Sequence, residues 1–186
     1  MNRLELEQKL KDFDDADILS AEEINNISKM LLNEDISRQR YICIEETAEL
    51  IQEITKAKRN KLNKLGLSEE IADMLLCINN IYVLFIHNIP FYDIKLDPYE
   101  ILFETNNITN GKRCYEVSDI KSLSDMIELF DFTIYKDHSS LCGDDIFKIC
   151  NCIYNIDKII NMYGIDRMDI LRIIAIKIKR FNDGHR

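Results

Sequence analysis

The stretch EETAELIQEITKAKRNKLNKLGLSEEIAD, residues 45–73, decides how this chain folds. Near its start Glu46 and Glu49 stand three residues apart, and at its end so do Glu70 and Asp73. Both pairs lie inside apolar sequence with helical periodicity. Residues three apart share one face of a helix, so each pair points in one direction. Two such helices packed antiparallel would bring four carboxylates to one point.

Four clustered carboxylates repel each other unless protons or cations neutralise them. Hard oxygen ligands of this kind suit Mg²⁺, or Mn²⁺ as the alternative ion, rather than a soft metal. The simpler interpretation is that the acids form the solvated faces of two amphipathic helices. The apolar residues that bracket both acidic pairs argue against it: Ile42, Leu50, Ile51, Ile54, Ile71, Leu75 and Ile78. The pattern therefore predicts a metal site beside a buried core.

The same residues resemble a known family. EExxE is followed after 20 residues by ExxD. This spacing, with the approach ISRQRYICIEETAELIQEITK and the exit SEEIADMLLCINNIY, resembles the MazG-like all-α nucleoside triphosphate pyrophosphatases. The resemblance covers residues 36–89 closely and the C-terminal helix loosely. It implies an all-α antiparallel helical bundle. It also implies Mg²⁺-dependent hydrolysis of a (deoxy)nucleoside triphosphate to the monophosphate and pyrophosphate.

The resemblance further implies roles for single residues. The metal ligands would be Glu46, Glu49, Glu70 and Asp73. Glu45 matches the first acid of the motif and would be catalytic, positioning or deprotonating the attacking water, or orienting a ligand. The basic C-terminal helix resembles the family's final helix, where Lys177 and Arg180 would meet the triphosphate.

Two further substrate contacts are candidates from their positions alone. Gln39, upstream of the acids, could reach the base or sugar, or could equally be a solvated helix residue. Lys56 stands in a cluster of cations at the end of the first acidic helix and could bind phosphate. Cations near a helix C-terminus are also favourable on dipole grounds alone, an explanation that applies to Lys56, Lys177 and Arg180.

Composition limits the classes of protein to consider. The chain has 186 residues, 46% hydrophobic and 31% charged, enough for one domain over residues 1–186. With 2 Pro and 5 Gly it favours helices. A formal net charge of −9 disfavours nucleic-acid binding. No stretch reaches the length of a membrane span, and the N-terminal sequence is too charged for a signal peptide. The 6 cysteines are expected to be free thiols in a reducing cytoplasm.

Helical periodicity and capping residues predict helices over residues 2–12, 21–32, 36–59, 69–87, 98–104 and 167–182, with a loop at 106–112. The first helix should use Leu4, Leu10 and Phe13 as its apolar side. The expected signals at helix ends are a capping box of Ser20 with Glu23, an N-cap at Ser68, Gly164 after a C-terminus and an N-cap at Asp166.

The second half of the chain repeats the outline of the first. SLSDMIELFDF (122–132) aligns with CIEETAELIQE (43–53), and DDIFKICNCIYNI (144–156) aligns with EEIADMLLCINNI (69–81). The acidic set is broken there: Ser124 falls on Glu45 and Lys148 on Asp73. Either residues 117–182 contain a degenerate second repeat and the C-terminal helix, making an internal pseudo-dimer, or two amphipathic helix pairs are alike by chance.

Other functions remain open at this point. Di-iron helical bundles need Glu-x-x-His pairs, and no acid stands three positions before His87, His138 or His185. The stronger alternative is a non-catalytic helical adaptor or nucleotide-sensing module on a decayed pyrophosphatase scaffold. The expected partner is a small nucleotide, with no nucleic acid and no membrane. The chain would act as a homodimer or as an internally pseudo-dimeric monomer.

Overall fold

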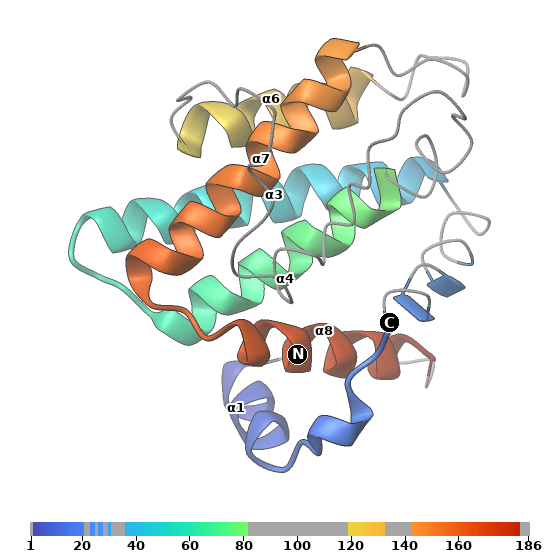
Figure 1. Cartoon of the computed structure of the whole chain (residues 1–186), viewed down its shortest axis with the longest axis vertical. Helices are drawn as coiled ribbons and strands as arrows, with labels where there is room; N and C mark the ends of the chain where they lie inside the picture. Colours follow the sequence, from blue (N-terminus) through green and yellow to red (C-terminus); the bar gives the residue numbers. More distant parts are fainter. Residues whose placement is uncertain are drawn as a thin grey trace.

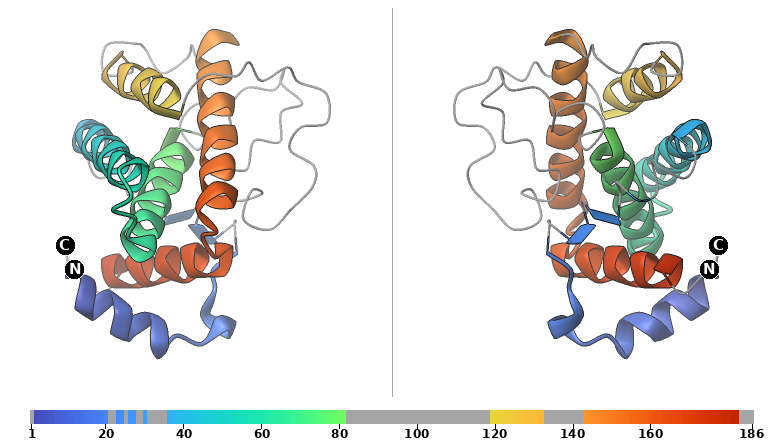
Figure 2. Two further views of the ribbon diagram at one scale, coloured as in Figure 1. Left: turned by 90° about the vertical axis from the view of Figure 1, so that its left-hand side faces the viewer. Right: turned by 90° about the vertical axis from the view of Figure 1, so that its right-hand side faces the viewer.

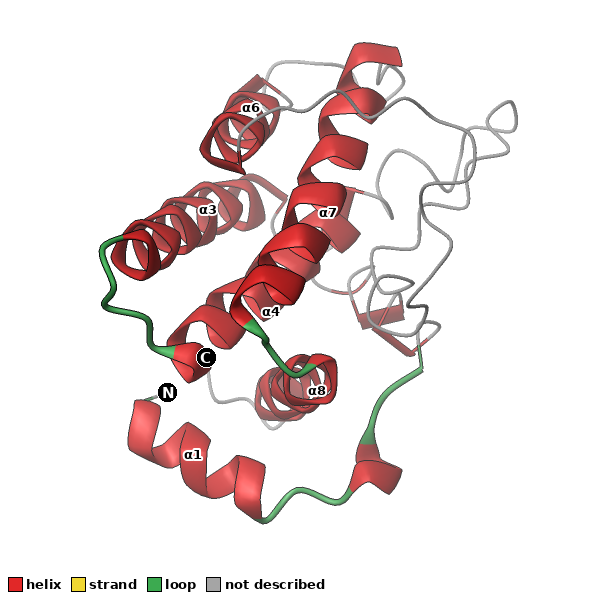
Figure 3. Cartoon of the chain, turned by 60° about the vertical axis from the view of Figure 1, so that its left-hand side comes forward, coloured by secondary structure: helices red, strands yellow, loops and turns green. Residues whose placement is uncertain are grey.

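The computed structural model describes residues 2–20, 23–24, 26–27, 30, 36–81, 119–132 and 143–182. Within these ranges the regular structure is helical and no strand occurs, which confirms the all-α prediction (Figure 3). The elements are α1 (Arg3–Lys11), the 3₁₀ turn η1 (Asp15–Asp17), α3 (Ile36–Lys58), α4 (Lys64–Ile81), α6 (Asp119–Phe132), α7 (Gly143–Tyr163) and α8 (Arg167–Asn182).

Helices α3 and α4 form an antiparallel hairpin, and the two acidic motifs lie on its facing helices. Thr47 fixes the register, because its Oγ1 lies 3.3 Å from Met74 Sδ and also donates to the Cys43 carbonyl over 2.6 Å. The Cys43 and Cys77 thiols hydrogen-bond to each other one turn further along. Leu50 and Ile54 of α3 are fully buried, as are Ile71 and Leu75 of α4. The expected buried stripe beside the acids is therefore confirmed.

Helix α4 begins earlier than the sequence suggested. Asn63 is its cap, since its Oδ1 accepts a hydrogen bond of 3.1 Å from the amide of Gly66. The prediction of Ser68 as N-cap is wrong: its hydroxyl donates to the Lys64 carbonyl over 2.8 Å, inside the helix. A serine hydroxyl bonds readily to the carbonyl four residues back, so Ser68 is accommodated within α4 and does not begin it.

The other capping predictions within the described residues are confirmed. Ser20 and Glu23 form the reciprocal capping box, with the Ser20 amide donating to Glu23 Oε2 over 2.8 Å and the Glu23 amide to Ser20 Oγ over 3.3 Å. Gly164 follows α7 with φ +59°, which favours glycine. Asp166 caps α8, because its Oδ1 accepts from the Met168 amide over 2.9 Å.

Helix α1 buries a different residue from the one expected. Leu6 is fully buried, whereas Leu4 is 79% exposed. The prediction of Leu4 on the apolar side is therefore wrong, while Leu10 and Phe13 pack partly buried against the core. Leu6, Leu10 and Phe13 follow the four- and three-residue spacing of one helical face.

The helices stack in layers around the α3–α4 hairpin. Helix α6 packs along α3 and pairs with α7 to form a second helix pair (Figure 1). Helix α8 packs against α4, and α1 packs against α8 beyond it (Figure 2). An ion pair joins α8 to the η1 turn that follows α1, because Arg172 Nε lies 2.7 Å from Asp15 Oδ1. Placing α8 against α4 brings the basic C-terminal helix to the acidic hairpin.

Several predictions fall outside the described residues: the helix at 98–104, the loop at 106–112, the end of the predicted 69–87 helix, the three histidines, Cys114 and Cys142. The remaining cysteines are free thiols; Cys43, Cys77 and Cys152 are buried and Cys150 is partly buried. Among the described helices, no segment combines the length and the apolar character that a bilayer crossing requires.

Candidate metal centre

Three carboxylates from the facing helices converge on one point. Glu46 and Glu49 of α3 and Glu70 of α4 each offer a ligand atom, and all of these atoms lie within 4.8 Å of one another. Opposite ligands of an octahedral Mg²⁺ stand about 4.2 Å apart, slightly less than this limit, so a single divalent cation could contact all three after a small movement of the side chains. The i, i+3 spacing in α3 and the antiparallel register place three of the four predicted acids together, and Asp73 is not among them.

Glu70 supplies the strongest sign that the cluster needs a cation. Its Oε2 atom is buried and has no hydrogen-bond partner in the structure. A buried carboxylate oxygen without a partner is costly, because it loses hydration and gains nothing in return. A hard divalent cation would satisfy it, and the all-oxygen donor set suits such an ion. The residues present therefore fit the group that the acidic motif implies.

The electrostatics of the cluster agree with this need. Burial, and then the negative charge of Asp73, raise the pKa of Glu46 to about 7. Burial, Asp73 and then Glu49 raise the pKa of Glu70 to about 8. Each carboxylate opposes the ionisation of its neighbours in the absence of a counter-charge. A divalent cation would remove that opposition.

Asp73, the fourth predicted ligand, has a different contact. Lys177 of α8 donates a hydrogen bond from Nζ to Asp73 Oδ2, and the same Nζ lies 3.4 Å from Glu69 Oε1. Burial opposes the charge on Lys177, but Asp73 and then Glu69 raise its pKa overall, so it is an ammonium. Lys177 is therefore an ammonium that Asp73 and Glu69 hold beside the three converging acids.

The other predicted site residues lie at varying distances from the cluster. Glu45 is exposed next to Glu46, and Gln39 is half-buried nearer the start of α3. Lys56 is ion-paired with Glu53 over 2.6 Å. It stands seven residues beyond Glu49, roughly 10 Å along the helix axis. The described contacts thus connect Lys56 with Glu53 and not with the converging acids.

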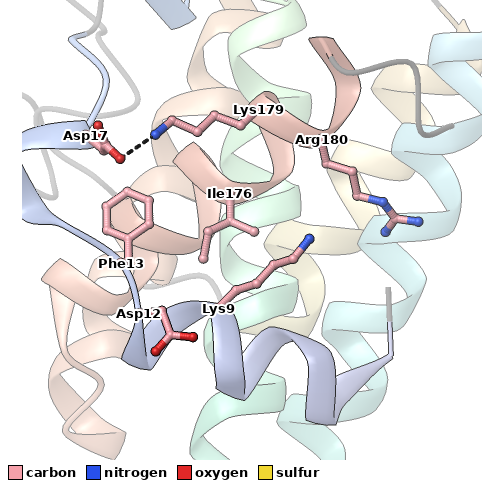
Figure 4. Close-up of a pocket in the computed structure, with 7 residues that line it drawn as sticks. All are labelled: Lys9, Asp12, Phe13, Asp17, Ile176, Lys179 and Arg180. Carbon is pink, nitrogen blue, oxygen red and sulfur yellow. Dashed lines mark ion pairs between the residues drawn. The ribbon is translucent and has the colours of Figure 1, made fainter.

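Arg180 stands in the last turn of α8, at a surface pocket between α1 and α8 (Figure 4). The pocket has a volume of about 320 Å³ and is lined by Lys9, Asp12, Phe13, Asp17, Ile176, Lys179 and Arg180. Lys179 is bound to Asp17 over 2.7 Å. Figure 4 shows the Arg180 side chain directed away from that pair. Lys177 and Arg180 are three residues apart, so they share a broad face of α8.

The acids of the second helix pair, α6 and α7, have different partners from those of α3 and α4. Asp125, which aligns with Glu46, is ion-paired with Lys121 of the same helix. Glu128, which aligns with Glu49, has Lys148 Nζ at 3.7 Å. Lys148 is the residue that replaces the last acid of the motif. The aligned acids of α6 thus have lysine partners from within their own helix pair.

Glu69 is the residue at this centre to which sequence reasoning gave no role. It stands directly before Glu70, and its importance comes from a lysine 108 positions away in sequence (177 − 69), which is 3.4 Å away in space. Only the packing of α8 against α4 reveals that contact. A second acid beside ExxD was visible in the sequence, but nothing there showed which cation would meet it.

Comparisons with known proteins supply no family for this chain, since no protein-family model, curated protein or solved structure matches it.

Proposed function

We propose that this protein hydrolyses a (deoxy)nucleoside triphosphate to the monophosphate and pyrophosphate with the help of a divalent cation, Mg²⁺ first among the candidates. The observation that carries the proposal is the convergence of Glu46, Glu49 and Glu70 around an unpartnered buried oxygen of Glu70. The paired motifs with their spacing, which resemble the MazG-like pyrophosphatases, supply the reaction type. Lys177 beside the acids supports a triphosphate, whose negative charge needs cations from the protein as well as a metal.

Within this proposal Glu46, Glu49, Glu70 and Asp73 hold the metal. A bound Mg²⁺ would neutralise phosphate charge and lower the pKa of the attacking water. Side chains of the protein would transfer the proton and bind the phosphates. Glu45 is exposed beside the ligands, where it can accept a proton from the water that attacks the α-phosphorus. Lys177 binds the phosphates, with Arg180 further along the same helix.

The second helix pair is part of the proposal. We assign α6 and α7 as a degenerate counterpart of α3 and α4, so that one chain forms a pseudo-dimeric bundle. The pairing of Glu128 with Lys148 supports this assignment, because a lysine there compensates the acid that a metal would otherwise neutralise. Only the α3–α4 pair then has the acids for catalysis.

The test is an assay of purified protein with Mg²⁺ and a panel of canonical and modified (d)NTPs, in which pyrophosphate and monophosphate are measured. We expect turnover of at least one triphosphate. Glu46→Gln should lower kcat by about 10³-fold or more, since it removes a metal ligand in the site. Asp125→Asn, the aligned change in the second pair, should leave kcat within about twofold because it lies outside the acidic cluster.

Absence of turnover on the whole panel would overturn the enzymatic proposal. If nucleotide binding persisted without turnover, the chain would be a nucleotide-sensing module on the same scaffold. Equal losses in Glu46→Gln and Asp125→Asn would show instead that the two pairs act together, against the assignment of catalysis to α3 and α4 alone.

A further inference from the structure

Lys177 of α8 contacts Asp73, one of the four predicted metal ligands. It is the point where α8 meets α4, and its Nζ contacts both Asp73 and Glu69. All three side chains are largely buried, with 21%, 14% and 18% of their side-chain surface exposed for Lys177, Asp73 and Glu69. The contact is thus part of the packed interface between the two helices, and a charge left alone there would be costly.

Asp73 is the acid of the ExxD motif that does not belong to the converging group. Among the described residues, the ligand atoms that gather within 4.8 Å come from Glu46, Glu49 and Glu70. The Asp73 carboxylate is instead bound by the Lys177 ammonium. A cation therefore already neutralises Asp73 at Oδ2, and a metal that binds this oxygen would compete with the ammonium for it, because the two positive charges repel each other at that distance.

Glu69 offers the displaced ammonium a second acceptor. Glu69 and Asp73 are four residues apart in α4, so their side chains stand one above the other on the same face. Glu70 is the next residue along and belongs to the group shared with α3. Lys177 is already 3.4 Å from Glu69, so a small change of its side-chain torsions would exchange one carboxylate for the other.

We propose that Lys177 neutralises Asp73 in place of the metal in the metal-free protein, and that metal binding transfers its ammonium to Glu69. Glu69 is then a positioning residue, which keeps Lys177 beside the site once Asp73 binds the metal. The consequence is a coupling: the lysine that binds phosphate is released from Asp73 only when the metal is present. This inference rests on the metal site of the proposed function, but not on hydrolysis.

The test is Mn²⁺ binding to metal-free protein, followed by the electron paramagnetic resonance signal of the free ion. Lys177→Met should tighten Mn²⁺ binding by about tenfold, because it removes the competing cation. Lys179→Met is the matched control: it removes the same charge two residues away, from a lysine bound to Asp17, and should change the affinity by less than about twofold. Lys177→Gln repeats the measurement should the Met variant fold poorly.

Glu69 is tested by a double-mutant cycle. Glu69→Gln should weaken Mn²⁺ binding several-fold in the wild-type background, since the displaced lysine loses its acceptor. In the Lys177→Met background the same change should have little effect, whereas a purely long-range charge effect would be equal in both. Circular dichroism checks that each variant is folded.

Three outcomes would overturn the inference. The first is absence of Mn²⁺ binding to the wild-type chain. The second is a Lys177→Met affinity no tighter than that of Lys179→Met. The third is a Glu69→Gln effect of equal size in both backgrounds, which would leave Glu69 without a positioning role. Hydrolysis is scored separately: a chain that shows the expected cycle but turns over no triphosphate supports this inference and contradicts the proposed function.

Discussion

The two helix pairs of this protein share an outline and differ in where their acids find positive charge. In α3 and α4, three carboxylates converge and one buried oxygen is left without a partner. In α6 and α7, the aligned acids Asp125 and Glu128 are ion-paired with Lys121 and Lys148. The first group keeps an unpartnered buried oxygen even though Lys177 is bound to the neighbouring Asp73, so a further cation would satisfy it, whereas Asp125 and Glu128 already have lysine partners. This difference is the reason for proposing a metal site in the first helix pair and none in the second.

The strongest test of the shared outline concerns the core rather than the acids. Leu50 and the aligned Leu129 are both almost fully buried, at 0% and 1% exposure. Leu50→Ala and Leu129→Ala should each lower the free energy of unfolding by roughly 2–5 kcal/mol, through lost apolar burial and the cavity left behind. Urea denaturation followed by circular dichroism measures both. A much smaller loss for Leu129→Ala would mean that α6 is a peripheral addition and not an equivalent of α3.

The sequence predicted the parts of this molecule that depend on local pattern. The spacing predicted that four acids converge, and helical geometry with an antiparallel hairpin is enough to place three of them, Glu46, Glu49 and Glu70. Asp73, the fourth, is bound by Lys177. The Gly164 and Asp166 signals were also sufficient, since a cap depends only on residues within one turn.

What the sequence did not predict depends on competition or on distant packing. Ser68 resembles an N-cap, but Asn63 lies five residues earlier and caps the helix first, so the helix includes Ser68. Leu4 was assigned to the apolar side of α1 although Leu6 has the four-residue spacing from Leu10 that places both on one helical face, so this error lies in the interpretation of the periodicity. The ion pair of Lys177 with Glu69 and Asp73 depends on the docking of α8 against α4, for which no local signal exists.

The pH dependence of stability should separate the two helix pairs in the metal-free protein. Glu46 and Glu70 have pKa values of about 7 and about 8 when folded, both raised from 4.5. The folded state therefore binds more protons than the unfolded state between pH 4.5 and 8, so stability falls as the pH rises through this window. Both groups are partly exposed, and we expect a decrease in Tm of only several degrees.

Thermal unfolding at a series of pH values, with a chelator present, measures this decrease. Glu70→Gln should flatten the curve between pH 4.5 and 8, and Asp125→Asn is the matched control, because Asp125 lies outside the group of converging acids. Added Mg²⁺ should restore stability at pH 8, since the metal binds the deprotonated carboxylates. A curve that is equally steep in Glu70→Gln would assign the dependence to other groups and remove this support for an unneutralised cluster.

The smallest expected effect on stability comes from the residue that marks the difference between the pairs. The carboxylate of Glu128 is 68% exposed and 3.7 Å from Lys148, so removing this ion pair should cost no more than about 1 kcal/mol.

Lys148→Asp places an acid where the first pair has Asp73, next to Glu128 and on the same helix as Asp145. If the two pairs are equivalent, this variant should gain a second, weaker Mn²⁺-binding event, which electron paramagnetic resonance can detect. Lys148→Met, which removes the charge without adding a ligand, should gain none. Identical titrations for the two variants would mean that positions 148 and 73 are not structurally equivalent, and the similarity between the halves would then be no more than that of two amphipathic helix pairs.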